Sequence, residues 1–229
     1  MLYMNRLVLI KPSKEYKDAI IEMLDEWSSY NATHVTDPSP RAIFHDYSDF
    51  DAYLAEFVRA ETKPKPEHVP ATTYFALDEQ RNKIVGAICI RHYLTEALLN
   101  SGGHIGDGVR PSERGKGYGK EILRLALKEC KYTFRIKKVL ISAHSDNIAS
   151  IKAIEANGGI FDKTVMDDGK PLQLYWVHLD GHTKYTQNDL ALDIETLRKK
   201  RFMNLISEEK FEEEKHELAQ KYLADKDND

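Results

Sequence analysis

Cysteine is scarce in this chain, with only two among 229 residues. Neither Cys89 nor Cys130 has a partner at the spacing of a metal site or a redox pair, so we expect no metal and reduced cysteines in the core. No segment approaches the roughly 18 apolar residues of a membrane span. The N-terminus also lacks the basic region, long apolar stretch and cleavage site of an export signal. We therefore expect a cytoplasmic protein with no membrane partner.

An excess of positive charge is missing as well, since the formal net charge is −4. Proteins that bind nucleic acid usually carry a strongly basic face, so we expect no nucleic acid as a main partner. The composition, with 41% hydrophobic and 31% charged residues, is ordinary for a soluble globular protein and favours no substrate class. The length suits one domain with embellishments rather than two domains.

The apolar patterning predicts the element order strand, helix, helix, three strands, helix, strand, helix, two strands. The predicted strands cover residues 6–10, 72–77, 84–94, 104–109, 139–142, 160–164 and 172–177, and the predicted helices cover residues 13–27, 49–61, 117–131 and 147–157. Polar stretches at 78–83 and 167–170 predict hairpin turns. This order indicates an α/β protein.

The most distinctive segment joins the strand that ends at Val109 to the helix that follows. Residues 114–120, with the sequence RGKGYGK, are called the glycine turn below. Glycines at alternate positions let consecutive backbone N–H groups approach an anion at a helix N-terminus, and the basic side chains add positive charge. The spacing is neither a dinucleotide fingerprint nor a P-loop. The alternative is a glycine-rich turn that holds no ligand.

The run R-x-x-G-x-G from Arg114 to Gly119 resembles the acyl-CoA signature of the GNAT acetyltransferase superfamily. A second segment is similar to the superfamily's next motif: a strand at 139–142, then N-x-x-S from Asn147 to Ser150 and a short helix that ends in glycine. The resemblance covers roughly residues 5 to 179. It implies a mixed central sheet flanked by helices, acetyl-CoA as the acyl donor, and transfer of the acetyl group to a primary amine by direct attack in a ternary complex.

The same resemblance implies which residues bind the cofactor. The pantetheine arm would pair with strand backbone, the pyrophosphate would lie on the glycine turn, and the start of the next helix would contact the arm. The implied residues are Val109, Arg114, Gly115, Lys116, Gly117, Tyr118, Gly119, Lys120, Asn147 and Ser150. For Asn147 and Ser150, helix capping is the competing interpretation.

The catalytic groups depart from the family pattern. Many relatives have a tyrosine that protonates the leaving thiolate, but this chain has Ile154 there, so Ser150 is the candidate acid. Many relatives have a strand glutamate where this chain has glycine and histidine. The candidate bases are His104, placed first because a histidine pKa lies near neutrality, and then Glu96, Asp107 and His92. A structural role for the histidine and a catalytically silent acyl-CoA-binding or regulatory module are the alternatives.

The acceptor amine depends on variable loops, which we expect at residues 31–70 and 94–103. Side chains that could line its pocket are Tyr30, His34, Phe44, His45, Tyr47, Tyr93 and Glu96. We expect residues 1–180 to form the acetyltransferase domain, with a helix and loop insertion at 31–70. Residues 181–229 would form a helical, charged C-terminal extension. This extension would be a dimer arm of a homodimer, a lid, an anion patch or a solvated helix.

Overall fold

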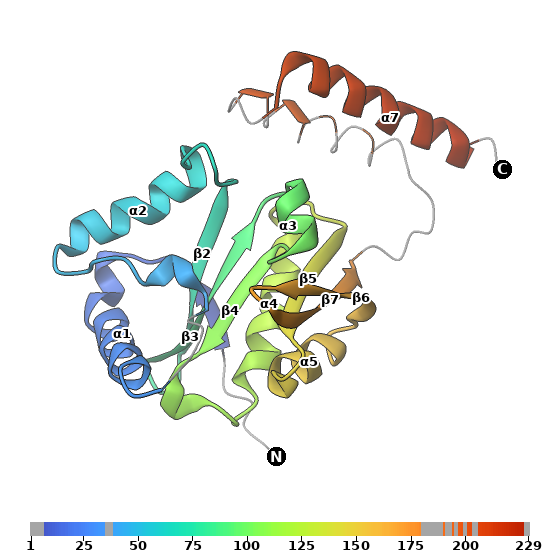
Figure 1. The fold of residues 1–229 in the computed structure, drawn as a ribbon. Helices are drawn as coiled ribbons and strands as arrows, with labels where there is room; N and C mark the ends of the chain where they lie inside the picture. Colours follow the sequence, from blue (N-terminus) through green and yellow to red (C-terminus); the bar gives the residue numbers. More distant parts are fainter. Residues whose placement is uncertain are drawn as a thin grey trace.

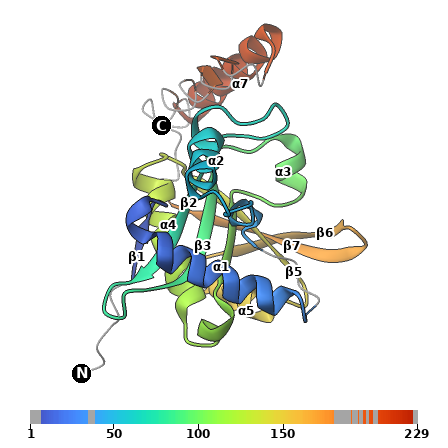
Figure 2. The ribbon, with the colours of Figure 1, turned by 90° about the vertical axis from the view of Figure 1, so that its left-hand side faces the viewer.

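The computed structural model describes residues 7–34, 39–179, 190, 194, 197–198, 201–202 and 206–226. Seven strands form one mixed sheet in the order β1-β2-β3-β4-β5-β7-β6, with helices on both of its faces (Figures 1 and 2). The α/β fold with a mixed central sheet and a C-terminal helix is therefore confirmed.

The strands are β1 (Leu7–Ile10), β2 (Ala71–Asp78), β3 (Lys83–Arg91), β4 (Ile105–Val109), β5 (Lys138–His144), β6 (Ile160–Asp167) and β7 (Lys170–His178). The helices are α1 (Lys17–Asn31), α2 (Phe50–Thr62), α3 (Glu96–Asn100), α4 (Tyr118–Tyr132), α5 (Ile148–Glu155) and α7 (Glu208–Lys226). Within the described residues, the 3-10 turns are η1 (Lys14–Tyr16), η2 (Arg41–Ile43) and η3 (Pro111–Glu113). The predicted element order is found, with α3 as an additional short helix.

Two predicted boundaries differ from the structure. The strand expected at 84–94 ends at Arg91, because the neighbouring strand β2 begins at Ala71, opposite Arg91. The chain then turns into α3, which Thr95 caps. The helix expected at 13–27 begins as the 3-10 turn η1 and continues as α1 to Asn31.

Each face of the sheet carries its own hydrophobic core. On one face α1 buries Ile20, Met23, Leu24 and Trp27, whose spacing places them on a single side of the helix, and α2 extends this core over β2. On the other face α4 buries a second apolar stripe against β1, β3 and β4. Cys130 lies fully buried in that second core, as expected, whereas Cys89 on β3 is half-buried.

The sheet is almost divided between β4 and β5. These two parallel strands share a single pair, Ile105 with Ile141, whereas β5 pairs with β7 along its whole length from Lys138 to His144. Strand β5 therefore belongs structurally to the β5-β7-β6 unit. Beyond Ile105 and Ile141 the two strands part, and we call this opening the β4–β5 gap.

The C-terminal extension contains α7, while most of residues 190–206 lie outside the described residues. Among the helices that the structure describes, none is long and apolar enough to cross a membrane. The boundary between domain and extension near residue 180 stays a prediction.

Candidate functional site

The β4 edge of the gap presents backbone groups. In the antiparallel pairing with β3, Arg110 N–H donates to Val85 O and Arg91 N–H donates to His104 O, both at 2.8 Å. Alternate residues of β4 therefore direct their N–H and C=O groups toward β3. Those of Asp107 and Val109 point the other way, into the gap. A chain with amide groups, laid along the gap, would find donors and acceptors at strand spacing.

The glycine turn begins where β4 and the turn η3 end. Gly115 and Gly117 have φ values of +76° and +87°, in the left-handed region that favours glycine. A Cβ atom on either would meet no described atom within 4 Å, so the space above the turn is open. Gly117 is also the N-cap of α4 and has no side chain to satisfy the first N–H groups of the helix. These groups and the helix dipole form a place for an anion.

The side chains of the glycine turn are mostly engaged with the protein. Arg114 Nε donates to Val109 O at 3.3 Å, and its guanidinium lies 4.6 Å from the ring centroid of Tyr30 on α1. Lys116 Nζ donates to Glu113 at 2.9 Å, and Tyr118 is buried. Gly119 has ordinary clearance, since its Cβ would lie 3.5 Å from a methyl group of Val109. The turn therefore offers its backbone to a ligand more than its side chains.

The second predicted segment lies beside the start of α4. Asn147 is the N-cap of α5 and its Oδ1 accepts from Ser150 N–H at 3.1 Å, so both residues take part in capping. The Ser150 hydroxyl is not used in this bond. Further along, Asn157 Nδ2 donates to Lys120 O at 3.0 Å and ties α5 to the first turn of α4. Sequence reasoning missed Asn157, whose contact partner is 37 residues away.

His104 lies buried just before β4. Its imidazole Nδ1 accepts from the backbone N–H of Leu140 at 3.0 Å, and the backbone N–H of His104 donates to Leu140 O at 2.8 Å. The residue therefore joins the start of β4 to β5. Burial, together with the nearby charge of Arg91, lowers the pKa of His104 to about 4. The imidazole is neutral at pH 7, but Nδ1, the nitrogen that could accept a proton, already accepts a hydrogen bond from the backbone N–H of Leu140.

Asp107 lies on β4 at the gap, between Ile105 and Val109. Its side chain is half-buried, and burial raises the pKa of the carboxyl to about 6, although the N–H of Asp107 itself opposes the shift. A carboxylate with this pKa can take up a proton near neutrality.

The other two candidate bases lie elsewhere. Glu96 is an exposed residue in the first turn of α3. His92 follows β3, where its Nε2 is 2.9 Å from Thr72 Oγ1 and its ring stacks on Phe134 with 4.5 Å between centroids. A position that sequence reasoning did not consider is His144, the last residue of β5, whose buried Nδ1 has no partner among the described residues.

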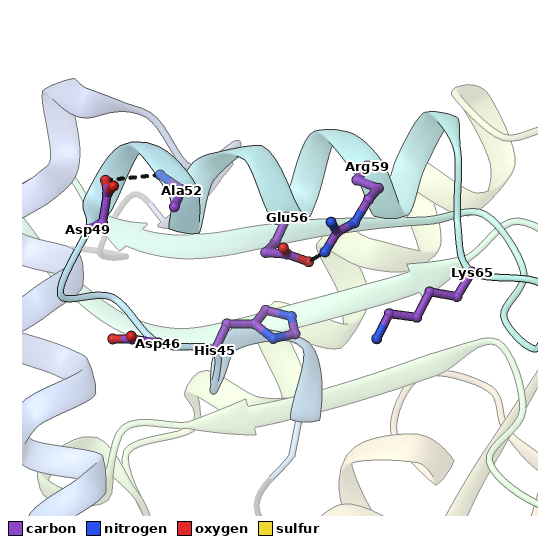
Figure 3. A pocket seen from close by; sticks show the side chains of 7 residues that line it. All are labelled: His45, Asp46, Asp49, Ala52, Glu56, Arg59 and Lys65. Atoms are coloured by element: carbon purple, nitrogen blue, oxygen red, sulfur yellow. Dashed lines mark hydrogen bonds and ion pairs between the residues drawn. The ribbon is translucent and has the colours of Figure 1, made fainter.

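A groove of about 370 Å³ runs along α2, in the segment expected to contact the acceptor. Its lining residues are His45, Asp46, Asp49, Ala52, Glu56, Arg59 and Lys65 (Figure 3). Asp49 caps α2 through Asp51 N–H and Ala52 N–H, and Glu56 pairs with Arg59. No lining residue belongs to β4, β5 or the glycine turn, so this groove is separate from the gap. In the described part of the chain, no three metal-ligating side chains cluster.

A family model described as an acetyltransferase (GNAT) domain matches residues 6–160, which is more than half of the chain. A search of curated proteins found no match. Among solved structures, the ribosomal-protein-S5-alanine acetyltransferase from Vibrio fischeri aligns with a TM-score of 0.58 at 15% identity, over 79% of this chain and 97% of that one.

Two further structures with a similar fold contain ligands. The spermidine N-acetyltransferase from Vibrio cholerae, in complex with CoA and spermine, has a TM-score of 0.55 at 10% identity over 77% of this chain and 97% of that one. The microcin C7 self immunity acetyltransferase MccE, in complex with acetyl-CoA and AMP, has a TM-score of 0.55 at 16% identity over 76% of this chain and 93% of that one.

Proposed function

Because the chain belongs to the GNAT acetyltransferase family, whose acyl donor is acetyl-CoA, we propose that it transfers an acetyl group to a primary amine by direct attack in a ternary complex. The observation that carries this proposal is that the β4–β5 gap and the glycine turn adjoin each other. The β4–β5 gap has backbone amides along one edge, and it leads directly to the open glycine turn at the start of α4. We infer that the reaction takes place in the cytoplasm.

The residues present fit such a cofactor. Asp107 and Val109 offer backbone N–H and C=O groups to the amides of a pantetheine arm, and the N–H groups from Gly115 to Lys120 offer donors to a pyrophosphate. Asn147 and Ser150 follow the end of β5, the other strand that borders the gap, and we propose that they contact the arm from that side. When bound, acetyl-CoA supplies the thioester whose carbonyl carbon the amine nitrogen attacks.

An amine at neutral pH carries a proton that must leave before the nitrogen can attack, so the site needs a base. We propose Asp107 for this role, because it lies on β4, the strand that borders the gap, and burial raises the pKa of its carboxyl to about 6. His104 is less suited, since its accepting nitrogen is held by Leu140 N–H and its pKa is about 4.

The departing thiolate needs a proton, and we propose the hydroxyl of Ser150 as the donor. The position that holds a tyrosine in many relatives is Ile154 here, and that side chain is buried in the core below α4. The absence of the tyrosine also favours the second candidate function, a module that binds acyl-CoA without turnover.

Calorimetric titration with acetyl-CoA and with free CoA tests the proposal first. Binding in the micromolar range supports the cofactor site, and absence of binding would reject both candidate functions. Protein that binds should then be assayed for thiol release with a panel of primary amines that includes a polyamine and a peptide with an N-terminal alanine. Turnover with any amine supports the enzyme, whereas binding without turnover across the panel favours the silent module.

A further inference from the structure

The glycine turn is held at two points, just before its start and at the first residue of α4, by one side chain from a distant hairpin. Glu113 immediately precedes the turn and Tyr118 lies within it as the first residue of α4; they are 2% and 7% exposed. Arg81, in the tight turn between β2 and β3, donates from Nη1 and Nη2 to the two carboxylate oxygens of Glu113 at 2.9 and 2.6 Å. The same Nη1 donates to Tyr118 Oη at 3.0 Å.

Glu113 needs these partners because a buried carboxylate without them is unstable. Lys83 Nζ and Lys116 Nζ also approach its oxygens, at 3.3 and 2.9 Å. The Arg81 guanidinium and the two lysines hold the pKa of Glu113 far below its usual range. Among the three cations only arginine presents two parallel N–H groups, so only Arg81 fixes the orientation of the carboxylate as well as its charge.

Asp78, which is fully buried at the end of β2, completes a ring of hydrogen bonds with Arg81 and Tyr118. Tyr118 Oη donates to Asp78 Oδ2 at 2.8 Å, and Arg81 N–H donates to Asp78 Oδ1 at 3.2 Å. The first residue of α4 is thereby fixed to the hairpin. Because the N-terminal N–H groups of α4 follow the position of Tyr118, their direction is set by the same contacts.

We propose that Arg81 is a positioning residue for the glycine turn, holding its backbone N–H groups in the geometry that binds the pyrophosphate of the cofactor. The inference rests on the proposed function. The flexible glycines between Glu113 and Tyr118 have many accessible conformations, and anchoring both flanks limits them before the ligand arrives. Lys116 contributes charge to this anchor, since its ammonium group helps to neutralise Glu113, but it does not fix the orientation of the carboxylate.

The test compares Arg81→Lys with Arg124→Lys. Arg124 also forms a bidentate pair, with Glu121 on the exposed side of α4 at 2.8 and 2.6 Å, but it touches neither flank of the turn. We expect Arg81→Lys to raise the dissociation constant for CoA about tenfold and the KM for acetyl-CoA similarly, with kcat at saturation unchanged. Arg124→Lys should leave both constants within about twofold of the parent protein.

The inference can be overturned in more than one way. If the parent protein binds CoA and folded Arg81→Lys binds it equally well, Arg81 does not position the turn and the proposed function stands. If the parent protein does not bind CoA, the proposed function fails and the inference fails with it. Should circular dichroism show that Arg81→Lys is unfolded, Tyr118→Phe removes the two hydrogen bonds of the tyrosine hydroxyl, with Arg81 and with Asp78, at nearly constant volume. Weaker CoA binding by that variant supports the inference, and unchanged binding overturns it.

Discussion

The glycines of β4 and those of the turn that follows it have different physical roles. On β4, a Cβ at Gly108 would lie 2.0 Å from Ser39 O and 2.9 Å from the ring of Trp27, so the strand is packed closely against the α1 side. In the turn, Gly115 and Gly117 have nothing within 4 Å but adopt left-handed φ values. On β4, Gly108 needs to be glycine for packing, and in the turn Gly115 and Gly117 need to be glycine for conformation and ligand approach. One residue type therefore serves stability in one segment and binding in the next.

The largest expected effect is a loss of stability when the close packing of β4 is disrupted. Gly108→Ala should lower the free energy of unfolding by about 3 kcal/mol, the upper end of the usual range for overpacking, because the added Cβ would clash with the backbone oxygen of Ser39. Gly106→Ala is the matched control, since its Cβ would lie 3.6 Å from Ser39 Oγ and meet ordinary contacts. Urea unfolding of both variants measures the difference. Equal stabilities would show that the Ser39–Pro40 segment does not pack on β4 in solution.

The next largest effect separates binding from packing in the turn. Gly117→Glu should weaken CoA binding by at least about a hundredfold, because it places a carboxylate where the pyrophosphate would lie. Gly169→Glu controls for backbone strain: Gly169 in the β6–β7 turn has φ +77° and equally open surroundings. Both variants should lose about 1 kcal/mol of stability, but only the first should lose affinity. Calorimetry would contradict the assignment if both bound CoA alike.

This contrast also explains what the sequence could and could not predict. The glycine turn is a local pattern, and its position between a strand and a helix was predictable from periodicity. The β4–β5 gap was implied only by the family resemblance, because it depends on which residues of two distant strands fail to pair. The role of Arg81 gave no local signal, since Glu113 and Tyr118 lie more than 30 residues away from it in the sequence. His104 was placed first among the bases by residue type, while its environment is set by Leu140 on another strand.

A smaller effect is expected at Asp107, on the gap side of β4. Asp107→Asn should lower turnover roughly tenfold to a hundredfold and remove the rise of the rate as pH increases through about 6. Asp162→Asn, at an exposed position of β6, is the control. A pH profile of kcat/KM that still rises near pH 6 in Asp107→Asn would reject Asp107 as the base.

The same variant should be more stable than the parent protein at neutral pH. The pKa of Asp107 is higher in the folded chain than the ordinary value near 3.9, so ionisation above about pH 6 disfavours folding by about 2 to 3 kcal/mol. Asparagine removes this cost. A melting temperature at pH 7.5 that rises by a few degrees in Asp107→Asn, but not in Asp162→Asn, is the expected result.

The smallest effect at neutral pH is expected at His104, which belongs to the packed region by its contacts. Asparagine can place Oδ1 where Nδ1 accepts from Leu140 N–H, so His104→Asn should cost about 1 kcal/mol of stability, whereas His104→Ala leaves a buried amide unpaired and should cost more.

The titration of His104 should affect the stability of the protein at acidic pH. The folded pKa of about 4 lies below the unfolded value near 6.5, so the folded chain binds fewer protons and loses up to about 3 kcal/mol between these pH values. His104→Asn should remove that loss, which unfolding at pH 7 and pH 4.5 measures. If the asparagine variant also lost the acidic limb of the rate profile, the imidazole would be the base and Asp107 would not.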